Sequence, residues 1–316
     1  MTKVVHVAAA AIYLDDGRLL ISRRPAHLHQ GGLLEFPGGK LESDETPQQA
    51  LIRELEEELG IIPKQFEPLI RIPYDYPDKR VLLDVWRVTA FDGKPEGREG
   101  QQLYRLDIDG LEPAAFPAAN RPIIAALQLP QLYLITPELP TEILLQRLAS
   151  ALDTGVGLVQ LRANHLDDGA YLELADQVLP VCHRRGARLL LNRHPSMLAE
   201  VEADGVHLNS RLLEELQATG LPVLQNKWFG ASCHNAQQLR LAQQLGLDYA
   251  LLSPVCATET HPDAQPLGWT AFESLVAPMQ IPVYGLGGLS RGHLPQVLSH
   301  GGQGVAGIGA FIHRAV

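Results

Sequence analysis

The chain has 316 residues, of which 46% are hydrophobic and 20% charged, the composition of a soluble globular protein. This length favours two domains, and no stretch reaches the roughly 18 apolar residues that a membrane span needs. The net charge of −10 argues against binding of long nucleic acid but allows a small anionic substrate held through a metal ion. Three scattered cysteines and an N-terminus unlike a signal peptide predict a cytoplasmic protein with reduced thiols.

The first half predicts an α+β domain with a mixed sheet. Strands over 4–14 and 18–22 flank Asp15-Asp16-Gly17, which is typical of a hairpin turn. Thr46 is a candidate N-cap for a helix that begins at Pro47 and stops at Gly60. Further along the chain we expect a strand and loop over 33–40, strands over 69–73 and 80–90, a loop over 92–100 and a closing helix over 123–127.

The pattern changes near Leu129-Pro130, which divides the chain into domains 1–129 and 130–316. In the second domain short apolar strands alternate with helices, which predicts a compact α/β domain, a TIM-type (β/α)₈ barrel. The eight expected strands are 132–135, 158–161, 189–191, 205–208, 229–232, 250–253, 283–286 and 305–308. Because the chain ends soon after the eighth, the last helix is expected to be very short or absent.

Three glutamates on the predicted first-domain helix carry its chemistry. Glu54, Glu57 and Glu58 have the i, i+3, i+4 spacing that places carboxylates on one helix face. A solvated acidic face is the plain alternative. Packed like charges destabilise a helix unless a cation neutralises them, and Mg²⁺, with Mn²⁺ as an alternative, suits oxygen ligands and a phosphate substrate.

Residues 39–61, GKLESDETPQQALIRELEEELGI, resemble the Nudix box at nine fixed positions in order. The resemblance implies an α/β/α sandwich that hydrolyses a diphosphate with Mg²⁺. Glu54, Glu57 and Glu58 are then metal ligands with the Gly38 carbonyl, Glu54 is the base acting on water, and Arg53 orients Glu54 or Glu57.

Three further stretches, ISRRPAHLHQGGLLEFPGGK, EGREGQ and FPAANRPII, resemble MutT-type Nudix hydrolases, which convert 8-oxo-dGTP to 8-oxo-dGMP and pyrophosphate. The alternatives are a surface arginine for Arg23, a solvated loop acid for Glu99 and a helix N-cap for Asn120. At Asp44 relatives often carry glycine, so a changed turn is expected there. The resemblance implies phosphate binding by Arg23, a base pocket at Glu35 and Phe36, a metal-binding Glu99 and purine recognition by Asn120, with Lys40 and Lys79 as further candidates for substrate binding.

Five pieces of the second domain, VQLR, DGVHL, GASCH, SPVCATET and YGLGGL, resemble thiamine phosphate synthase and its TenI-type relatives. The resemblance implies a phosphorylated small-molecule ligand at the barrel mouth. Glycines at barrel turns can also be required sterically, and a lone histidine is often structural. The candidate ligand residues are Arg162, Ser232, His234, Thr258, Thr260, Gly287, Gly288 and Gly309.

The departures from the synthases concern their acidic metal ligands and their lysines. Arg193 follows Asn192 where an aspartate is expected, and Leu212 ends a stretch that lacks the second aspartate. His261 and Asn164 stand where lysines are expected, and Lys227 is the only lysine of this half. These changes argue against synthase activity and against Schiff-base chemistry.

Four hypotheses remain. The first is an oxidised-nucleotide diphosphatase whose barrel binds a phosphorylated ligand or serves as a structural partner. The second is a hydrolase for another diphosphate, such as a thiamine-related one, which the fusion motivates and Asn120 opposes. The third is a bifunctional enzyme with an active thiamine synthase, and the fourth is a barrel that senses a thiamine-related phosphate. The barrel's ligand and the oligomeric state stay open.

Overall fold

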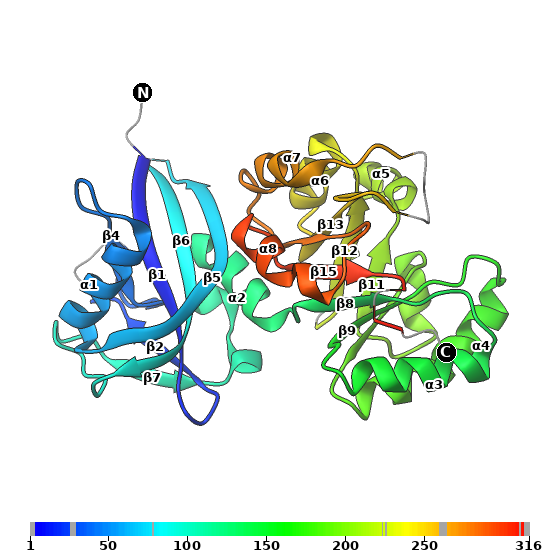
Figure 1. The fold of residues 1–316 in the computed structure, drawn as a ribbon, viewed down its shortest axis with the longest axis horizontal. Coiled ribbons are helices and arrows are strands. Elements are labelled where there is room, and N and C mark those ends of the chain that lie inside the picture. The colour runs from blue at the N-terminus through cyan, green and yellow to red at the C-terminus, as the bar shows by residue number, and fades with distance from the viewer. Residues whose placement is uncertain are drawn as a thin grey trace. The chain divides into compact units, whose positions relative to one another are not determined.

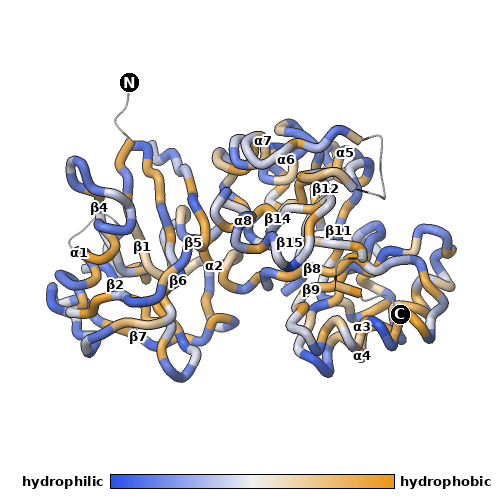
Figure 2. Tube along the Cα trace, in the orientation of Figure 1, coloured by the Kyte–Doolittle hydropathy of each residue, from blue (hydrophilic) through white to orange (hydrophobic). Residues whose placement is uncertain are grey.

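The computed structural model describes residues 4–25, 30–77, 79–222, 224, 226–258, 264–309 and 311–312. The chain forms two compact units, Met1–Gln128 and Leu129–Val316, so Leu129 belongs to the second unit (Figure 1). Figure 2 shows apolar residues along many of the strands and polar ones in the surrounding loops. No helix in the described ranges is long and apolar enough to cross a membrane.

The first unit is built on a mixed seven-stranded sheet. The path β3-β2-β1-β6-β5 is extended by β4, which pairs with β1, and by β7, which pairs with β2. β1 and β6 run parallel, and the other pairs are antiparallel. The elements are β1 (Val4–Tyr13), β2 (Leu19–Arg23), β3 (Leu34–Glu35), β4 (Gly38–Lys40), α1 (Pro47–Leu59), β5 (Ile62–Asp75), β6 (Arg80–Asp92), β7 (Leu103–Leu106), the 3₁₀ turns Ile108–Gly110, Pro113–Ala115 and Ala118–Asn120, and α2 (Arg121–Gln128).

Side chains on the two faces of this sheet enter two separate cores, because successive residues of a strand point to opposite sides. Along β1, Ala8 and Ala10 pack in a cluster with Leu51 and Leu55 of α1. Ala9 and Ala11 belong to the other cluster, which includes residues of α2. A sheet covered by a helix on each face is the expected α/β/α sandwich.

Helix α1 has the bounds expected from its sequence because both of its ends are capped by local interactions. Thr46 and Gln49 form a capping box, in which the Thr46 hydroxyl accepts from the Gln49 amide at 3.3 Å and the Gln49 side chain accepts from the Thr46 amide at 2.9 Å. Gly60 ends the helix with φ 69°, in the left-handed region. Asp44 also has a positive φ of 66°, which fits a turn where glycine is favoured.

The second unit is a closed parallel barrel in the order β10-β11-β12-β13-β14-β15-β8-β9, as expected from the sequence. The third strand is followed by a 3₁₀ turn instead of an α-helix, so the eight units are not equal. The elements are β8 (Leu132–Ile135), α3 (Thr141–Leu152), β9 (Leu158–Leu161), α4 (Asp168–His183), β10 (Arg188–Leu191), the turn Pro195–Ala199, β11 (Gly205–Leu208), α5 (Ser210–Thr219), β12 (Trp228–Cys233), α6 (Ala236–Gln244), β13 (Tyr249–Leu252), α7 (Gly268–Val276), β14 (Val283–Gly285), the turn Arg291–His293, α8 (Leu294–Ser299) and β15 (Gly304–Gly307).

Three tyrosines fill much of the barrel interior. Tyr133, Tyr249 and Tyr284 are fully buried, and their rings meet edge to face with centroids 5.4–5.8 Å apart. Leu158, Leu190 and other apolar residues complete this cluster, while a larger cluster lies between the strands and the surrounding helices. The packed interior leaves open space for a ligand at the end of the barrel.

Candidate functional site

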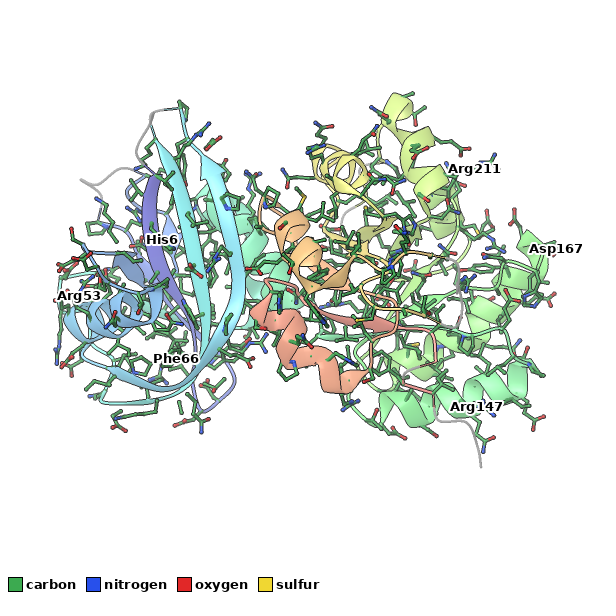
Figure 3. All side chains as sticks on the ribbon, turned by 45° about the horizontal axis from the view of Figure 1, so that its top comes forward. His6, Arg53, Phe66, Arg147, Asp167 and Arg211 are labelled. Carbon is green, nitrogen blue, oxygen red and sulfur yellow. The ribbon has the colours of Figure 1, made fainter. Side chains whose placement is uncertain are left out.

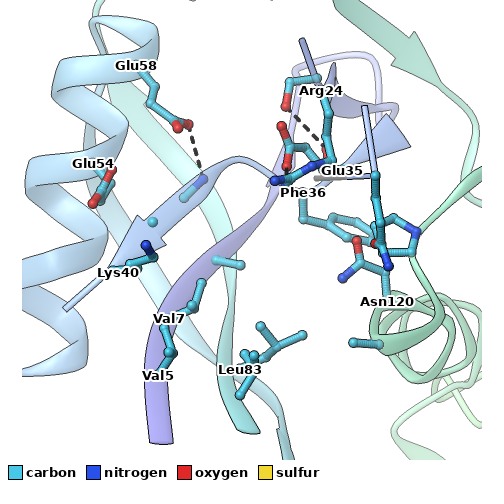
Figure 4. Close-up of a pocket in the computed structure, with 18 of the residues that line it drawn as sticks. Val5, Val7, Arg24, Glu35, Phe36, Lys40, Glu54, Glu58, Leu83 and Asn120 are labelled. Carbon is cyan, nitrogen blue, oxygen red and sulfur yellow. Dashed lines mark hydrogen bonds and ion pairs between the residues drawn. The ribbon is translucent and has the colours of Figure 1, made fainter. Parts of the chain in front are cut away.

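The first unit contains a cavity of about 520 Å³ that joins two chemically different regions. The carboxylates Glu54 and Glu58 lie at one side, on α1, and Phe36 and Asn120 lie at the other (Figure 4). The lining also includes Glu35, Gly38, Lys40, Lys79 and Glu99 from the residues expected at a site. Such a cavity suits an elongated ligand with an aromatic end and an end bound through a cation.

The acidic side of the cavity carries an excess of negative charge. Burial, and to a smaller extent the neighbouring carboxylates Glu35, Glu54 and Glu99, raise the pKa of Glu58 to about 8. The Gly38 amide donates to Glu58 Oε2 at 3.2 Å, which opposes that shift (Figure 4). Burial also raises the pKa of Glu54. Closely spaced buried carboxylates of this kind are stabilised by a cation.

Arg53, labelled in Figure 3, binds three glutamates of α1 and the preceding loop. Its guanidinium donates to both oxygens of Glu45 at 2.9 Å, to Glu54 Oε1 at 2.9 Å and to Glu57 Oε2 at 3.1 Å. It also donates to the Lys40 carbonyl at 3.0 Å, which ties the helix to β4. Arg53 is outside the cavity lining, a position that fits an orienting rather than a substrate-binding role.

Gly39 allows the Glu54 carboxylate to lie against strand β4. A Cβ atom at this position would stand 2.2 Å from the Glu54 carboxyl carbon and 2.3 Å from each of its oxygens. Real Cβ contacts are essentially never shorter than 3.0 Å, so a larger residue would have to displace the carboxylate. This close approach gives a physical reason for the first glycine of the motif.

The opposite side of the cavity is aromatic and amide-bearing. Phe36 stacks on Phe116 with ring centroids 5.5 Å apart and an interplanar angle of 24°. Asn120 is the last residue of a 3₁₀ turn and lines the cavity. Within the described ranges its side-chain amide makes no hydrogen bond, so a helix-capping role finds no support there.

Arg23 does not line the cavity, whereas its neighbour Arg24 does. Because Arg23 extends to the other side of the strand, its guanidinium donates to the Tyr104 hydroxyl at 2.9 Å and lies over that ring. Arg24 forms an ion pair with Glu35 (Figure 4). Of this pair Arg24, and not the expected Arg23, lines the cavity, and strand alternation is the signal in the sequence that could separate them.

The cavity's donor set fits a hard divalent cation, although the side chains are not gathered around one point. No group of three or more His, Cys, Asp or Glu side chains in the described part of the chain is close enough to hold a metal ion. Glu57 faces solvent with 58% exposure and is held by Arg53. Glu54, Glu58 and Glu99 line one cavity and offer only oxygen donors, the kind that Mg²⁺ prefers.

The barrel has a cavity of about 480 Å³ at the carboxyl ends of its strands. Five of the expected residues line it, namely Arg162, Ser232, His234, Thr258 and Gly287. Gly288 and Gly309 lie outside the lining, and Thr260 and His261 lie outside the described residues. No carboxylate is among the described lining residues, and asparagines 164, 192 and 209 contribute amides instead.

The arginine that replaces an expected acidic ligand turns away from this cavity. Arg193 donates to the carbonyls of Ala163 and Leu166 at 3.0 Å and lies over the Tyr171 ring, 4.0 Å from its centroid. Lys227 donates to the Ala203 carbonyl at 2.8 Å and is also absent from the lining. Arg193 and Lys227 therefore bind backbone carbonyls and do not line the cavity.

His234 and the two glycines of the barrel mouth have distinct local environments. His234 Nδ1 lies 3.0 Å from the Ser253 carbonyl oxygen and 3.3 Å from the Ser253 hydroxyl oxygen. At Gly287 and Gly288 an added Cβ would stand 2.7 Å from Pro254 Cβ and 2.2 Å from the Ala257 carbonyl oxygen. Both positions thus lack room for a side chain, independently of any contact that the glycines make with a ligand.

Comparisons with known proteins divide the chain in the same way. The family model described as NUDIX domain matches residues 8–126, and that described as thiamine monophosphate synthase matches residues 132–311. An 8-oxo-dGTP diphosphatase of Escherichia coli is 41% identical over 126 residues, which is 40% of this chain and 98% of that protein.

The barrel has its own relatives. A putative thiamine-phosphate synthase 2 of Aquifex aeolicus is 34% identical over 187 residues, which is 59% of this chain and all of that protein. A thiamine-phosphate synthase of a Synechococcus species is 36% identical over 174 residues, 55% of this chain. The chain spans only about half the length of that protein, 49%.

Proposed function

We propose that the first unit is a diphosphatase for oxidised guanine nucleotides. The premise is that the chain belongs to the Nudix family in its first half and to the thiamine monophosphate synthase family in its second. The first unit would hydrolyse 8-oxo-dGTP to 8-oxo-dGMP and pyrophosphate. One observation carries the proposal: a single cavity has carboxylates at one side and the Phe36–Asn120 region at the other. The Escherichia coli relative bears the name of this activity.

The carboxylates Glu54, Glu58 and Glu99, with the Gly38 carbonyl, are the residues that would hold Mg²⁺ or Mn²⁺. A bound divalent cation supplies positive charge to the phosphate oxygens and makes a nearby water more acidic. Glu57 would enter this set only by leaving Arg53, since its side chain faces solvent.

Glu54 is the proposed base that removes a proton from the attacking water. Arg53 holds one Glu54 oxygen at 2.9 Å, which leaves the second oxygen for the water. Lys40, Lys79 and Arg24 line the cavity and bring positive charge toward the polyphosphate. Arg53 would act by keeping Glu54 in place, because its guanidinium donates its hydrogen bonds to protein atoms.

Asn120 is the proposed selector of the base. Oxidation at C8 turns the guanine N7 acceptor into an N–H donor beside the O6 acceptor, and an amide can pair with both groups. Unmodified guanine presents two acceptors there, so the Asn120 carbonyl would lose its partner. A buried polar group without a partner costs roughly 1–3 kcal/mol, which corresponds to discrimination of about 5- to 150-fold.

The experiment is a measurement of kcat/KM for 8-oxo-dGTP, dGTP and thiamine-type diphosphates, with wild type and Asn120→Ala. We expect a large preference for 8-oxo-dGTP that falls by about 5- to 150-fold in the variant, while dGTP turnover falls less. A ratio unchanged by the substitution would remove the support for this substrate. Preference for a thiamine-type diphosphate would favour the second hypothesis instead.

For the barrel we propose a binding site for a phosphorylated small molecule, without thiamine phosphate synthase activity. Arg162, Ser232 and Thr258 supply charge and hydroxyl groups, and His234 is placed for proton transfer. The absence of carboxylates from the described lining disfavours a metal–pyrophosphate reaction. Complementation of a thiamine auxotroph that lacks the synthase would contradict this assignment, and failure to complement with normal expression is the expected result.

A further inference from the structure

A buried hydrogen-bond network runs across the barrel interior and reaches the cavity at Ser232. It joins Tyr133 of β8, Gln160 of β9, His207 of β11 and Tyr249 of β13. Tyr133, His207 and Tyr249 are fully buried, and Gln160 is 3% exposed. Ser232 of β12 and Gln160 both line the cavity, and Ser232 is the member bonded to His207.

The hydrogen bonds of the network are short, and three of its polar atoms lie at the corners of a nearly equilateral triangle. His207 Nδ1 lies 3.1 Å from the Tyr133 hydroxyl and 2.9 Å from the Tyr249 hydroxyl, and the two hydroxyls are 3.0 Å apart. Gln160 Nε2 donates to the Tyr133 hydroxyl at 3.0 Å. On the other edge of the imidazole, His207 Nε2 lies 2.9 Å from Ser232 Oγ.

The number of protons in this network decides their positions. Burial lowers the pKa of His207 to about 3, so the ring is neutral and carries one proton. If that proton were on Nδ1, the ring would donate to one tyrosine, and one of the two hydroxyl protons would have no acceptor. Within the described ranges the Tyr249 hydroxyl has no partner besides Tyr133 and His207.

If the proton is on Nε2, every group is satisfied. One tyrosine hydroxyl donates to Nδ1, and the other donates to its neighbour's oxygen. The Nε2–H group then donates to Ser232 Oγ. Because a buried hydroxyl proton without an acceptor is costly, this arrangement is strongly favoured over the first.

We propose that His207 fixes Ser232 as a hydrogen-bond donor to the ligand of the barrel cavity, and so acts as a positioning residue for ligand specificity. The proposal rests on the proposed function in one respect, that a ligand occupies this cavity. Since Ser232 Oγ already accepts from His207, its own proton points to the ligand. The ligand must present an acceptor there, and an anionic oxygen of a phosphate is a suitable one.

The tautomer of His207 tests the proton arrangement directly and needs no ligand. Long-range ¹H–¹⁵N correlation spectra of the full chain should show the proton on Nε2 in wild type. Because the tyrosines set the tautomer, the same state should persist in Ser232→Ala. An Nδ1–H tautomer in the wild-type protein would overturn the inference.

Titration with inorganic phosphate tests the ligand half of the proposal. As phosphate binds, the His207 Hε2 resonance should shift and saturate together with the Gly287 amide, which lines the same cavity. Ser232→Ala should lose the Hε2 response and bind phosphate at least about 5-fold more weakly. Ser274→Ala, which alters an exposed serine of α7 outside the lining, is the control and should keep the response.

The two possible failures are distinguishable. A Gly287 response without any His207 response would mean that phosphate binds but Ser232 does not donate to it, which overturns the inference. No response at any cavity resonance would refute the phosphate site itself and with it the proposed ligand contact. In that case the tautomer would still report whether the donor arrangement exists in the free protein.

Discussion

Replacing Gly39 by alanine should damage the diphosphatase without unfolding it. The added Cβ would stand 2.2 Å from the Glu54 carboxyl carbon, whereas ordinary contact begins at 3.4 Å. The carboxyl group must therefore move by at least about 1.2 Å, the difference between these distances. Its bond to Arg53 would be stretched or broken by such a movement.

The stability cost should be small because the clashing atoms are the end of a flexible side chain. An off-rotamer side chain costs about 0.5–1.5 kcal/mol, so a fall of a few degrees in Tm is expected. The catalytic cost should be much larger, since misplacing a reacting group by about 1 Å can reduce the rate about 100-fold. We therefore expect kcat to fall by about 100-fold, with little change in the affinity for nucleotide.

The assay is pyrophosphate release from 8-oxo-dGTP under saturating Mg²⁺, with thermal unfolding measured in parallel. Gly110→Ala is the matched control, because a Cβ there meets no atom within 4 Å. It should keep both activity and Tm. If Gly39→Ala retains kcat within about 3-fold of wild type, the position of Glu54 is not critical and the argument fails.

Three further predictions concern other groups. Glu54→Gln and Glu58→Gln should each lower kcat by several orders of magnitude, and excess chelator should abolish turnover; near-normal rates in either variant would exclude this metal site. Arg24→Ala should lower kcat/KM for the nucleotide by more than about 10-fold, and Arg23→Ala should do so by less; the reverse order would contradict the cavity assignment. Burial lowers the pKa of His207 to about 3, so below about pH 6.5 the unfolded chain takes up a proton that the folded protein does not. The free energy of unfolding should therefore be unaffected by this group above pH 6.5 and should fall by up to about 1.4 kcal/mol per pH unit below it, and the imidazole NMR shifts should not titrate above pH 5.

The parts of the fold that depend on local signals could be predicted from the sequence. The bounds of α1 agree with its capping residues Thr46 and Gly60, and all eight barrel strands were found from their apolar runs. β7 (Leu103–Leu106) was missed because its four residues carry no clear alternation of their own. Its position is decided by pairing with β2, a contact distant in sequence.

The candidate sites, too, could be predicted only where a local motif marks the residues. Glu54, Glu58, Glu99 and Asn120 were selected from motifs and do line one cavity, although their roles stay predictions. Glu57 belongs to the same motif, but its side chain is 58% exposed, pairs with Arg53 and does not line the cavity. The spacing of the glutamates in the sequence does not show which of them pairs with Arg53 outside the cavity.

In the barrel, the network that ends at Ser232 could not have been predicted. Its members lie on five different strands, and His207 was noted only within the piece DGVHL. A single sequence gives no sign that two tyrosines more than 100 residues apart share one imidazole nitrogen. Such information exists only once the strands have closed into a barrel.

Residues 129–131, the first of the second unit, are hydrogen-bonded to the barrel, and this determines where the chain can be divided. The carbonyls of Leu129 and Pro130 accept hydrogen bonds from Gln303 at 3.0 Å and from Tyr284 at 2.5 Å, and the Gln131 carbonyl accepts from Val305. A fragment that began at Leu132 would lack these three carbonyls, which accept from groups buried in the barrel. Separate expression of the two halves therefore has one favourable cut, the bond after Gln128, and each later start should yield a less soluble barrel.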